Sequence, residues 1–223
     1  MILHCARPWL CADLGAPHRV ISWALHRGGI VTAERIVWRE VRGADLPEGF
    51  DVTPWFAAEM AGRGAAEAVG LLTSRDVRAH HHATASAEGI TAEALVTAGL
   101  SNAESVGQRR DWARVARDWG TINIAVQVDC GLSETALIEA LSIVAEARTA
   151  AVMATGLCID GAPATGTGTD CIALAAPLAA PALPHAGLHT AVGEAVGAAC
   201  LAAISEWVAG WRAMGRIGAD NRL

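Results

Sequence analysis

The sequence contains no lysine and no tyrosine, so every one of its 17 positively charged side chains is an arginine. The absence of lysine excludes a P-loop lysine, a Schiff-base lysine and a lysine general base. The absence of tyrosine excludes a phenol as a general acid or as an oxyanion donor. These two absences remove several classes of enzyme before any motif is considered.

The sequence also lacks a basic stripe, long runs of one charge and paired cysteines. Its net charge is −6 and its isoelectric point is near 5.7, so no nucleic-acid partner is expected. None of the six cysteines forms a CxxC pair. We therefore expect neither a zinc-finger-type site nor a disulfide framework, and we interpret the cysteines as small buried residues.

No uninterrupted apolar run predicts a membrane span, although the mean hydropathy is +0.32. Much of the apolar content is alanine, and the longest apolar stretch, Cys171–Leu183, is broken by two prolines. A spanning helix needs about 20 predominantly apolar residues. The segment Val192–Val208 carries two glutamates and predicts an amphipathic or buried helix. We expect no membrane partner and, since Met1–Leu10 has no signal-peptide pattern, a cytoplasmic protein.

Hydrophobic periodicity and turn residues predict a mixed α/β (α+β) fold. Residues 1–223 are expected to form one domain, a mixed β-sheet packed by two long helices in the C-terminal half. Thr53 before Pro54 and Ser133 before Glu134 are predicted helix N-caps. Strands are predicted at 19–26, 31–41, 69–74, 77–86, 92–100, 121–128 and 171–176, helices at 55–61, 133–156 and 190–214, and a loop with some helix at 101–118.

Three groups of residues match one family in order and spacing. They read TAGLSNA at 97–103, GTINI at 120–124 with LS at 132–133 and EARTAA at 146–151, and ATGTGTD at 164–170 with GLH at 187–189 and GEAVG at 193–197. On these residues the chain resembles the adenosylcobinamide amidohydrolases. Arg148 stands where this family usually has lysine.

The resemblance implies hydrolysis of adenosylcobinamide to adenosylcobyric acid and aminopropanol in corrinoid salvage. The implied partner is a corrinoid small molecule. No cofactor or resident metal is implied, because the cobalt belongs to the substrate.

The glycine- and threonine-rich segment from Thr165 to Asp170 is the first candidate site. Alternating glycines let the backbone approach a ligand closely and can form an anion or oxyanion nest. Thr165, Gly166, Thr167 and Gly168 are therefore candidate substrate-binding residues, and Thr169 is a candidate nucleophile. Asp170 could orient a hydroxyl or act as a general base. The same composition is also typical of an ordinary turn leading into a strand.

His189 and Glu194 flank the start of the last predicted helix. Amide hydrolysis needs an activated water or nucleophile, so we interpret His189 as the general base, oriented by Asp170 or Glu194. His189 and Glu194 could also share a proton relay or bind a metal together. A structural role at the helix N-terminus is the alternative.

Three further polar residues, Asn102, Thr121 and Asn123, follow or begin apolar segments. At strand ends they could bind the peripheral amides of a corrin, or they could form turn and strand-edge hydrogen bonds. The run His80–His82 suggests a metal tract. Residues in a strand alternate between faces, so an exposed polar strand end explains the run better.

The tryptophans divide into two groups. Trp207 and Trp211 lie four residues apart on the last helix and indicate either core packing or a subunit contact, which is compatible with a homodimer. One of the tryptophans in the N-terminal half could cover the flat macrocycle.

Two other classes of function remain open from the sequence. A corrinoid-binding module without catalysis would share the pocket and would differ only in turnover. An amidase that processes itself before Thr165 or Thr169 would expose an N-terminal threonine.

Overall fold

In the computed structural model, which describes residues 1–42, 45–47, 49–109, 120–178 and 181–213, eight strands form one mixed sheet. Their order is β4-β3-β2-β12-β8-β6-β5, and β1 pairs with β2 beside this path. The strands are β1 (Ile2–Ala6), β2 (Trp9–Ser22), β3 (Gly29–Glu40), β4 (Val69–Thr73), β5 (His81–Ala87), β6 (Ile90–Thr97), β8 (Asn123–Val128) and β12 (Cys171–Pro177). The helices are α1 (Val52–Gly62), α2 (Glu134–Met153) and α3 (Ala191–Ala213).

Strand β2 joins the two halves of the sheet. Its first part pairs with β1 and its last part pairs with β12, while β3 runs along its other side. The register with β3 shifts between Asp13 and His18, and such irregularities bend a strand and increase its twist. Two neighbouring pairs, β3 with β4 and β12 with β8, are parallel. The remaining pairs of this sheet are antiparallel.

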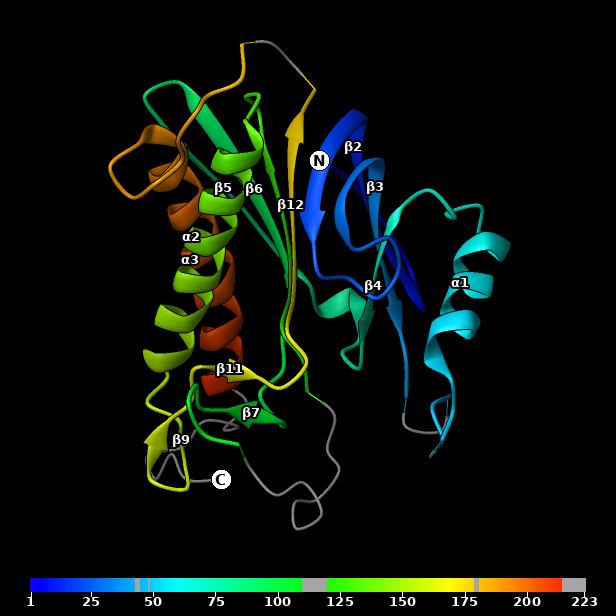
Figure 1. The fold of residues 1–223 in the computed structure, drawn as a ribbon. Helices are drawn as coiled ribbons and strands as arrows, with labels where there is room; N and C mark the ends of the chain where they lie inside the picture. The colour runs from blue at the N-terminus through cyan, green and yellow to red at the C-terminus, as the bar shows by residue number, and fades with distance from the viewer. Residues whose placement is uncertain (43–44, 48, 110–119, 179–180, 214–223) are drawn as a thin grey trace.

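Alternation of side chains along the strands separates the core into layers. In β8, Ile124 and Val126 point toward α2 and α3, whereas Ala125 belongs to a cluster on the other face with Leu10 and Trp38. Val37 packs under α1 on the face opposite to Trp38. Figure 1 shows α2 and α3 on one flank and α1 on the other. The sheet therefore curves around the cluster that contains Leu10, Trp38 and Ala125, and the helices pack on its outer face.

The long helices α2 and α3 form the outer layer over β5, β6, β8 and β12. Trp207 and Trp211 pack with ring centroids 4.9 Å apart and ring planes tilted by 43°, and they are 3% and 8% exposed within this layer. The face that the sequence offered as a subunit contact is thus buried in the chain's own core. The stretch Ala191–Trp211 is long and apolar enough for a membrane span, but 56% of its most apolar window is buried inside the fold, as in a core helix.

The mixed α/β fold and the two long helices are confirmed, whereas several element limits differ from the prediction. Strand β2 begins at Trp9 rather than at residue 19, and a 3-10 turn replaces the start of the strand predicted at 77–86. Helix α1 is capped by Asp51, whose carboxylate accepts from the backbone N of Thr53 at 3.2 Å. Asp51 thus takes the place of the predicted cap Thr53. Residues 110–118 of the predicted loop and Met214 lie outside the described residues.

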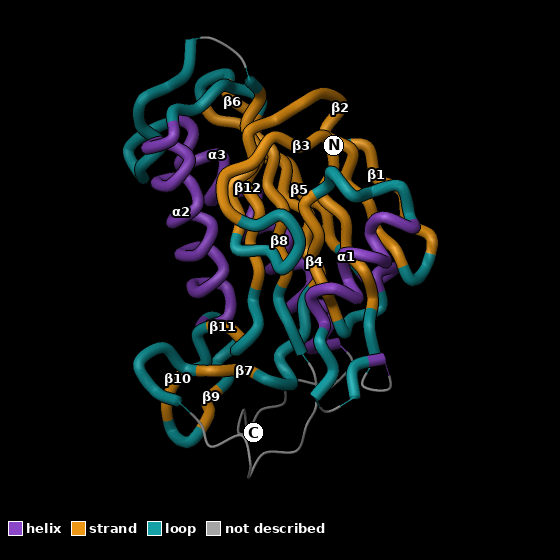
Figure 2. Tube along the Cα trace, turned by 45° about the vertical axis from the view of Figure 1, so that its right-hand side comes forward, coloured by secondary structure: helices purple, strands orange, loops and turns teal. Residues whose placement is uncertain are grey.

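Four short strands gather beyond the end of the sheet where β8 and β12 begin (Figure 2). They are β7 (Ala103–Glu104), which pairs with β11 (Gly166–Thr167), and β9 (Cys158–Ile159), which pairs with β10 (Ala162–Pro163). The glycine- and threonine-rich segment was expected to form a ligand-binding nest or an ordinary turn. Part of this segment, β11, pairs with β7 in the structure. A strand of two residues is too short for a hydrophobic pattern to predict it.

The predicted cap of α2 is confirmed and gives a test of the local structure. Ser133 Oγ accepts from the backbone N of Ala136 at 3.1 Å. Ser133→Ala should lower the free energy of unfolding by about 1 kcal/mol, since one helix-end N–H loses its partner. Urea denaturation measures the change. Ser142→Ala, on the exposed side of the same helix, is the control, and equal losses in both variants would contradict the capping role.

Candidate active site

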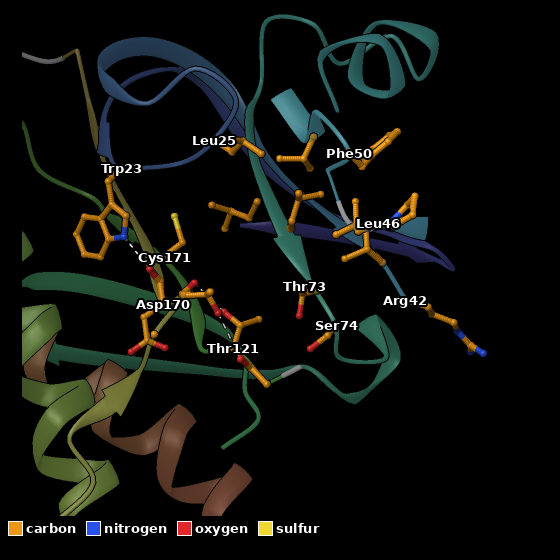
Figure 3. A pocket seen from close by; sticks show the side chains of 18 of the residues that line it. Trp23, Leu25, Arg42, Leu46, Phe50, Thr73, Ser74, Thr121, Asp170 and Cys171 are labelled. Carbon is orange, nitrogen blue, oxygen red and sulfur yellow. Dashed lines mark hydrogen bonds between the residues drawn. The ribbon is translucent and has the colours of Figure 1, made fainter. Parts of the chain in front are cut away.

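A pocket of about 720 Å³ opens where the two halves of the sheet meet. Its lining comes from the turn after β2, the segment after β3, the end of β4, and the residues that precede β8 and β12. Figure 3 shows Leu25, Leu46 and Phe50 on one side, and Thr73 and Thr121 on the other. The pocket thus has an apolar wall and a polar wall. Its volume lies within the range of about 300–1,000 Å³ that is usual for small-molecule sites.

The polar wall forms because β8 and β12 are parallel neighbours. Parallel pairing places their first residues side by side, with Cys171 opposite Asn123. The backbone N of Cys171 donates to the carbonyl of Ile122 at 3.0 Å and extends this pairing toward the pocket. The segments Gly120–Thr121 and Gly168–Asp170, far apart in the sequence, therefore line one wall together.

The carboxylate of Asp170 fixes the end of this wall. One oxygen accepts from the backbone N of Ile122 at 3.1 Å, and the other accepts from the backbone N of Thr167 at 3.0 Å. The hydroxyl of Thr167 and the guanidinium of Arg148 also donate to the Asp170 carboxylate, one to each oxygen. A Cβ on Gly166 would lie 2.5 Å from both Arg148 Nη1 and Asp170 Oδ2. The glycine therefore leaves the space in which this ion pair forms.

The hydroxyl of Thr169 is positioned next to Asp170. Asn102 Nδ2 donates to Thr169 Oγ1 at 3.2 Å, and that oxygen donates to the carbonyl of Gly120 at 3.3 Å. Thr121 Oγ1 donates to the carbonyl of Thr169 at 2.9 Å. Gly168 and Thr169 are both exposed to the pocket. The arrangement presents a held but accessible hydroxyl, which is the group needed for nucleophilic attack on an acyl carbon.

Trp23 connects the apolar wall to this polar wall. Its indole Nε1 donates to the backbone carbonyl of Asp170 at 2.7 Å, and 50% of the residue remains exposed (Figure 3). A tryptophan that is fixed at its polar edge and open on its ring face is suited to contact a flat ligand. Of the N-terminal tryptophans, Trp38 is fully buried, and Trp9 and Trp55 lie near Arg39.

Cys171 also lines the pocket, but its thiol is not activated. Burial raises its pKa to about 11, against which the hydrogen bond with Ser22 acts only in part. Cysteine reacts as the thiolate, and at neutral pH this thiol carries its proton. The Cys171 thiol is therefore not an activated nucleophile of this wall.

The family model for adenosylcobinamide amidohydrolase (CbiZ) matches residues 2–216 of the chain. This match covers nearly the whole sequence. The chain belongs to this family. Members of the adenosylcobinamide amidohydrolase family are amidohydrolases that act on a cobinamide substrate. No curated protein matches the chain.

Two solved structures resemble the fold of this amidohydrolase family member only distantly. The PH0078 protein of Pyrococcus horikoshii OT3 shares 12% identity over 88% of this chain and 75% of its own, with a TM-score of 0.47. The L-aminopeptidase D-Ala-esterase/amidase of Ochrobactrum anthropi, described as a variant of the Ntn hydrolase fold, shares 11% identity over 94% and 86%, with a TM-score of 0.39. At these scores neither similarity supports a conclusion about the site.

Some residues predicted to bind substrate instead build the site of this family member. Asn123 is fully buried and donates to the carbonyl of Leu72 at 2.6 Å, which ties β8 to the end of β4. Asn102 does not line the pocket, and its side-chain amide donates a hydrogen bond to the hydroxyl of Thr169. Thr165 Oγ1 accepts from the backbone N of Val106 at 2.8 Å. Of the predicted binding residues, Thr121 and Gly168 line the pocket.

The structure does not bring His189 and Glu194 to the pocket. Asp170 precedes the first residue of β12, whereas His189 follows the last one, and a strand of seven residues spans about 20 Å. Both side chains are exposed at the start of α3. Asp170 is therefore too far away to orient His189, which was one of the two predicted arrangements.

The GLH and GEAVG segments are explained by packing at that far end. A Cβ on Gly193 would lie 2.2 Å from the carbonyl oxygen of Gly187, so the loop can pass closely over α3. Glu139 of α2 accepts from the backbone N of Ala186 at 2.7 Å. Thr190 caps the helix, since its Oγ1 accepts from the backbone N of Gly193 at 3.0 Å.

The three consecutive histidines point to different partners. His80 Nδ1 contacts the carbonyl of Val77 at 2.8 Å, and His82 Nε2 contacts Glu93 at 3.0 Å on β6. His81 lies 3.7 Å from Glu206 on α3. Among the described residues, no three histidine, cysteine, aspartate or glutamate side chains gather as a metal site would require.

Apart from the suggestion that an N-terminal tryptophan could cover the ligand, sequence reasoning missed the contribution of the N-terminal half to the pocket. Leu25, Leu46 and Phe50 line it from segments outside the strands, and Thr73 lines it as the last residue of β4. Isolated apolar residues in such segments carry no local signal of function. The pairing of β2 with β12, which brings these segments to the site, is a long-range contact that periodicity does not reveal.

The ion pair of Asp170 and Arg148 gives a second test. Their side chains are 6% and 17% exposed. Asp170→Asn should lower the free energy of unfolding by about 3 kcal/mol, because it leaves a buried guanidinium without its carboxylate. Urea denaturation measures this loss.

Asp129→Asn is the matched control for that test. Its exposed carboxylate accepts from the backbone N of Thr91 at 2.9 Å. The change should cost much less, since solvent can replace this partner. An equally small loss in Asp170→Asn would show that its network does not hold the wall.

Proposed function

We propose that this chain hydrolyses the amide that joins aminopropanol to the corrin ring of adenosylcobinamide, giving adenosylcobyric acid and aminopropanol in corrinoid salvage. The observation that carries the proposal is the meeting of two family segments at one pocket. Gly120–Thr121 and Gly168–Asp170 both belong to residues that resemble the family, and both form the polar wall. The far-end family segment, by contrast, has a packing role.

The two walls of the pocket fit the two parts of such a substrate. The side chains of a corrin end in amides, which suit the hydroxyls of Thr73 and Thr121. The flat ring system suits Trp23 and the apolar side chains beside it. The pocket would take the reacting side chain and one edge of the ring, while the rest of the corrinoid stays outside.

In the proposed reaction, Thr169 Oγ1 attacks the carbonyl carbon of the aminopropanol amide. The carbon–nitrogen bond breaks, the proton of the hydroxyl goes to the leaving nitrogen, and aminopropanol departs. Water then hydrolyses the ester on Thr169 and releases the carboxylate of adenosylcobyric acid. Thr169 replaces His189 in this scheme because its hydroxyl lies in the pocket. The cobalt stays with the substrate, and the steps require no resident cofactor.

We also propose that this reaction takes place in the cytoplasm. All six cysteines are free thiols, as is usual for proteins of reducing compartments.

Turnover tests the proposal directly. Purified protein incubated with adenosylcobinamide should release adenosylcobyric acid, detected by mass spectrometry. Thr169→Ala should lower kcat by more than about 100-fold, because the acyl group loses its acceptor. His189→Ala should stay within about threefold of the parent protein, since its side chain is far from the pocket.

Two results would contradict the proposal. Tight corrinoid binding without product would favour a binding module instead. Loss of turnover in His189→Ala at unchanged stability, with Thr169→Ala still active, would move the chemistry to the far end of the sheet.

Trp23 gives a further prediction, because its ring and its N–H act separately. Trp23→Ala should raise KM about 10-fold through loss of the ring contact. Trp23→Phe should leave KM near that of the parent protein and lower kcat several-fold, since the N–H that holds the Asp170 carbonyl is gone. Steady-state kinetics with adenosylcobinamide separate the two effects.

Leu25→Ala is the control for the tryptophan variants. It removes apolar area from the same wall without removing a hydrogen bond. A fall in kcat as large as in Trp23→Phe would argue against a special role for the indole N–H.

A further inference from the structure

Repeated attack on bound substrate amides requires a base beside the hydroxyl of Thr169, and the described residues of the polar wall offer none that is free. The carboxylate of Asp170 already accepts from four donors, on Ile122, Arg148 and Thr167. The thiol of Cys171 carries its proton at neutral pH. No histidine is found among the described lining residues, and the sequence has no lysine.

One base would lie beside this hydroxyl if the chain were cut before Thr169. The residue would then carry an α-amino group on the carbon next to the one that bears Oγ1. An α-amine has a pKa of about 7.7–8.0, so a substantial fraction is neutral at neutral pH. An amine with this pKa can take the proton of the hydroxyl as attack proceeds and return it to the leaving nitrogen.

We propose that the chain cleaves its own Gly168–Thr169 peptide bond, and that the amino group released on Thr169 is the general base of the amidohydrolase. The second part of this proposal rests on the proposed function. The first part is an activity of the chain on itself and stands without any substrate.

The bond is held in place on both sides. Upstream, Thr167 pairs with Ala103 across β11 and β7, and its backbone N is bound by Asp170. Downstream, the carbonyl of Thr169 accepts from Thr121, and the carbonyl of Asp170 accepts from Trp23. Gly168 has no side chain to block the approach to its carbonyl carbon. Both residues of the bond are exposed, so water can reach the intermediate.

The chemistry of cleavage balances with one water. Thr169 Oγ1 attacks the carbonyl carbon of Gly168, the peptide carbon–nitrogen bond breaks, and the hydroxyl proton goes to the nitrogen of Thr169. This step leaves Gly168 as an ester on Oγ1. Water then hydrolyses the ester, which gives a carboxylate on Gly168 and restores the hydroxyl of Thr169 beside its new amine.

The two pieces produced by this cleavage would stay associated in the folded protein. Strand β12 lies between β2 and β8, and pairs with β8 over residues 171–175 and with β2 over residues 173–177. Helix α3 packs on α2, β5 and β6, which belong to the upstream part. The downstream piece, residues 169–223, would therefore remain bound to residues 1–168 after the peptide bond is lost.

The absence of lysine makes the test unusually clean, because an amine-specific reagent can label only α-amines. Full-length protein, incubated at neutral pH, is denatured, labelled and measured by mass spectrometry. We expect two labelled pieces, the second beginning Thr-Asp-Cys, whose masses without the labels add to that of the chain plus one water. Thr169→Ala should give one labelled piece, and Thr169→Ser should still give two. Thr84→Ala, an exposed threonine on β5, should cleave like the parent protein.

Several outcomes would overturn the proposal. A single intact chain overturns it, whether or not that chain turns over adenosylcobinamide. A second piece that begins at Thr165 or any other residue, or cleavage that persists in Thr169→Ala, assigns the cut to another cause. Cleavage with no release of aminopropanol keeps the self-processing and contradicts only the proposed function, so the two failures are distinguishable.

The role of the amine is read from the pH profile of the cleaved protein. The value of kcat/KM should rise about 10-fold per pH unit below the pKa of the α-amine and level off above about pH 8. Selective acetylation of that amine on the folded protein should remove turnover while corrinoid binding persists. Full activity of the acetylated protein would overturn the assignment of the base.

Discussion

The carboxylate of Asp170 is the constraint on which the site depends. It joins the start of β12 to α2 through Arg148, to the glycine-rich segment through Thr167, and to the approach of β8 through Ile122. Each of these partners comes from a different part of the sequence. Because the carboxylate is saturated, it acts as a fixed point rather than as a proton acceptor. The hydroxyl of Thr169 and the indole of Trp23 are both placed with respect to this fixed point.

The pocket depends in turn on the way β2 is shared. Its first part belongs with β1 and its last part with β12, so the N-terminal strands and the C-terminal strands meet along one ribbon. The apolar wall is supplied by the N-terminal half, and most of the polar wall by the C-terminal half. Neither half has a complete pocket, and the indole of Trp23 is a direct polar link between the two walls.

The sequence predicted most of what is local and little of what is long-range. The cap at Ser133 and the strands β8 and β12 follow from patterns of a few residues, and the structure has them close to the expected positions. Gly120–Thr121 and Gly168–Asp170 lie together because β8 and β12 pair in parallel. The family resemblance could suggest that these two segments meet, but the hydrophobic pattern of the sequence could not. Periodicity also gave no sign that the β2–β3 turn would reach the same pocket.

The candidate site shows the same division. Thr169, Asp170 and Thr121 were expected to act together and all three line the pocket. His189 was joined to them only because family resemblance and catalytic chemistry both favour a histidine. Its position after the last residue of β12 places it at the other end of the sheet. Arg148 was noted only as a departure from lysine. In the structure it keeps the positive charge that Asp170 requires.

The glycine contact between Gly187 and Gly193 has a consequence for how such proteins can diverge. The residues that let the loop pass over α3 are separated by the length of a strand from those that line the pocket. Selection on the shape of the fold and selection on the choice of ligand therefore act on different ends of the same sheet. A descendant could change the residues around Trp23 and adopt another substrate while the glycine contact at the far end stayed unaltered.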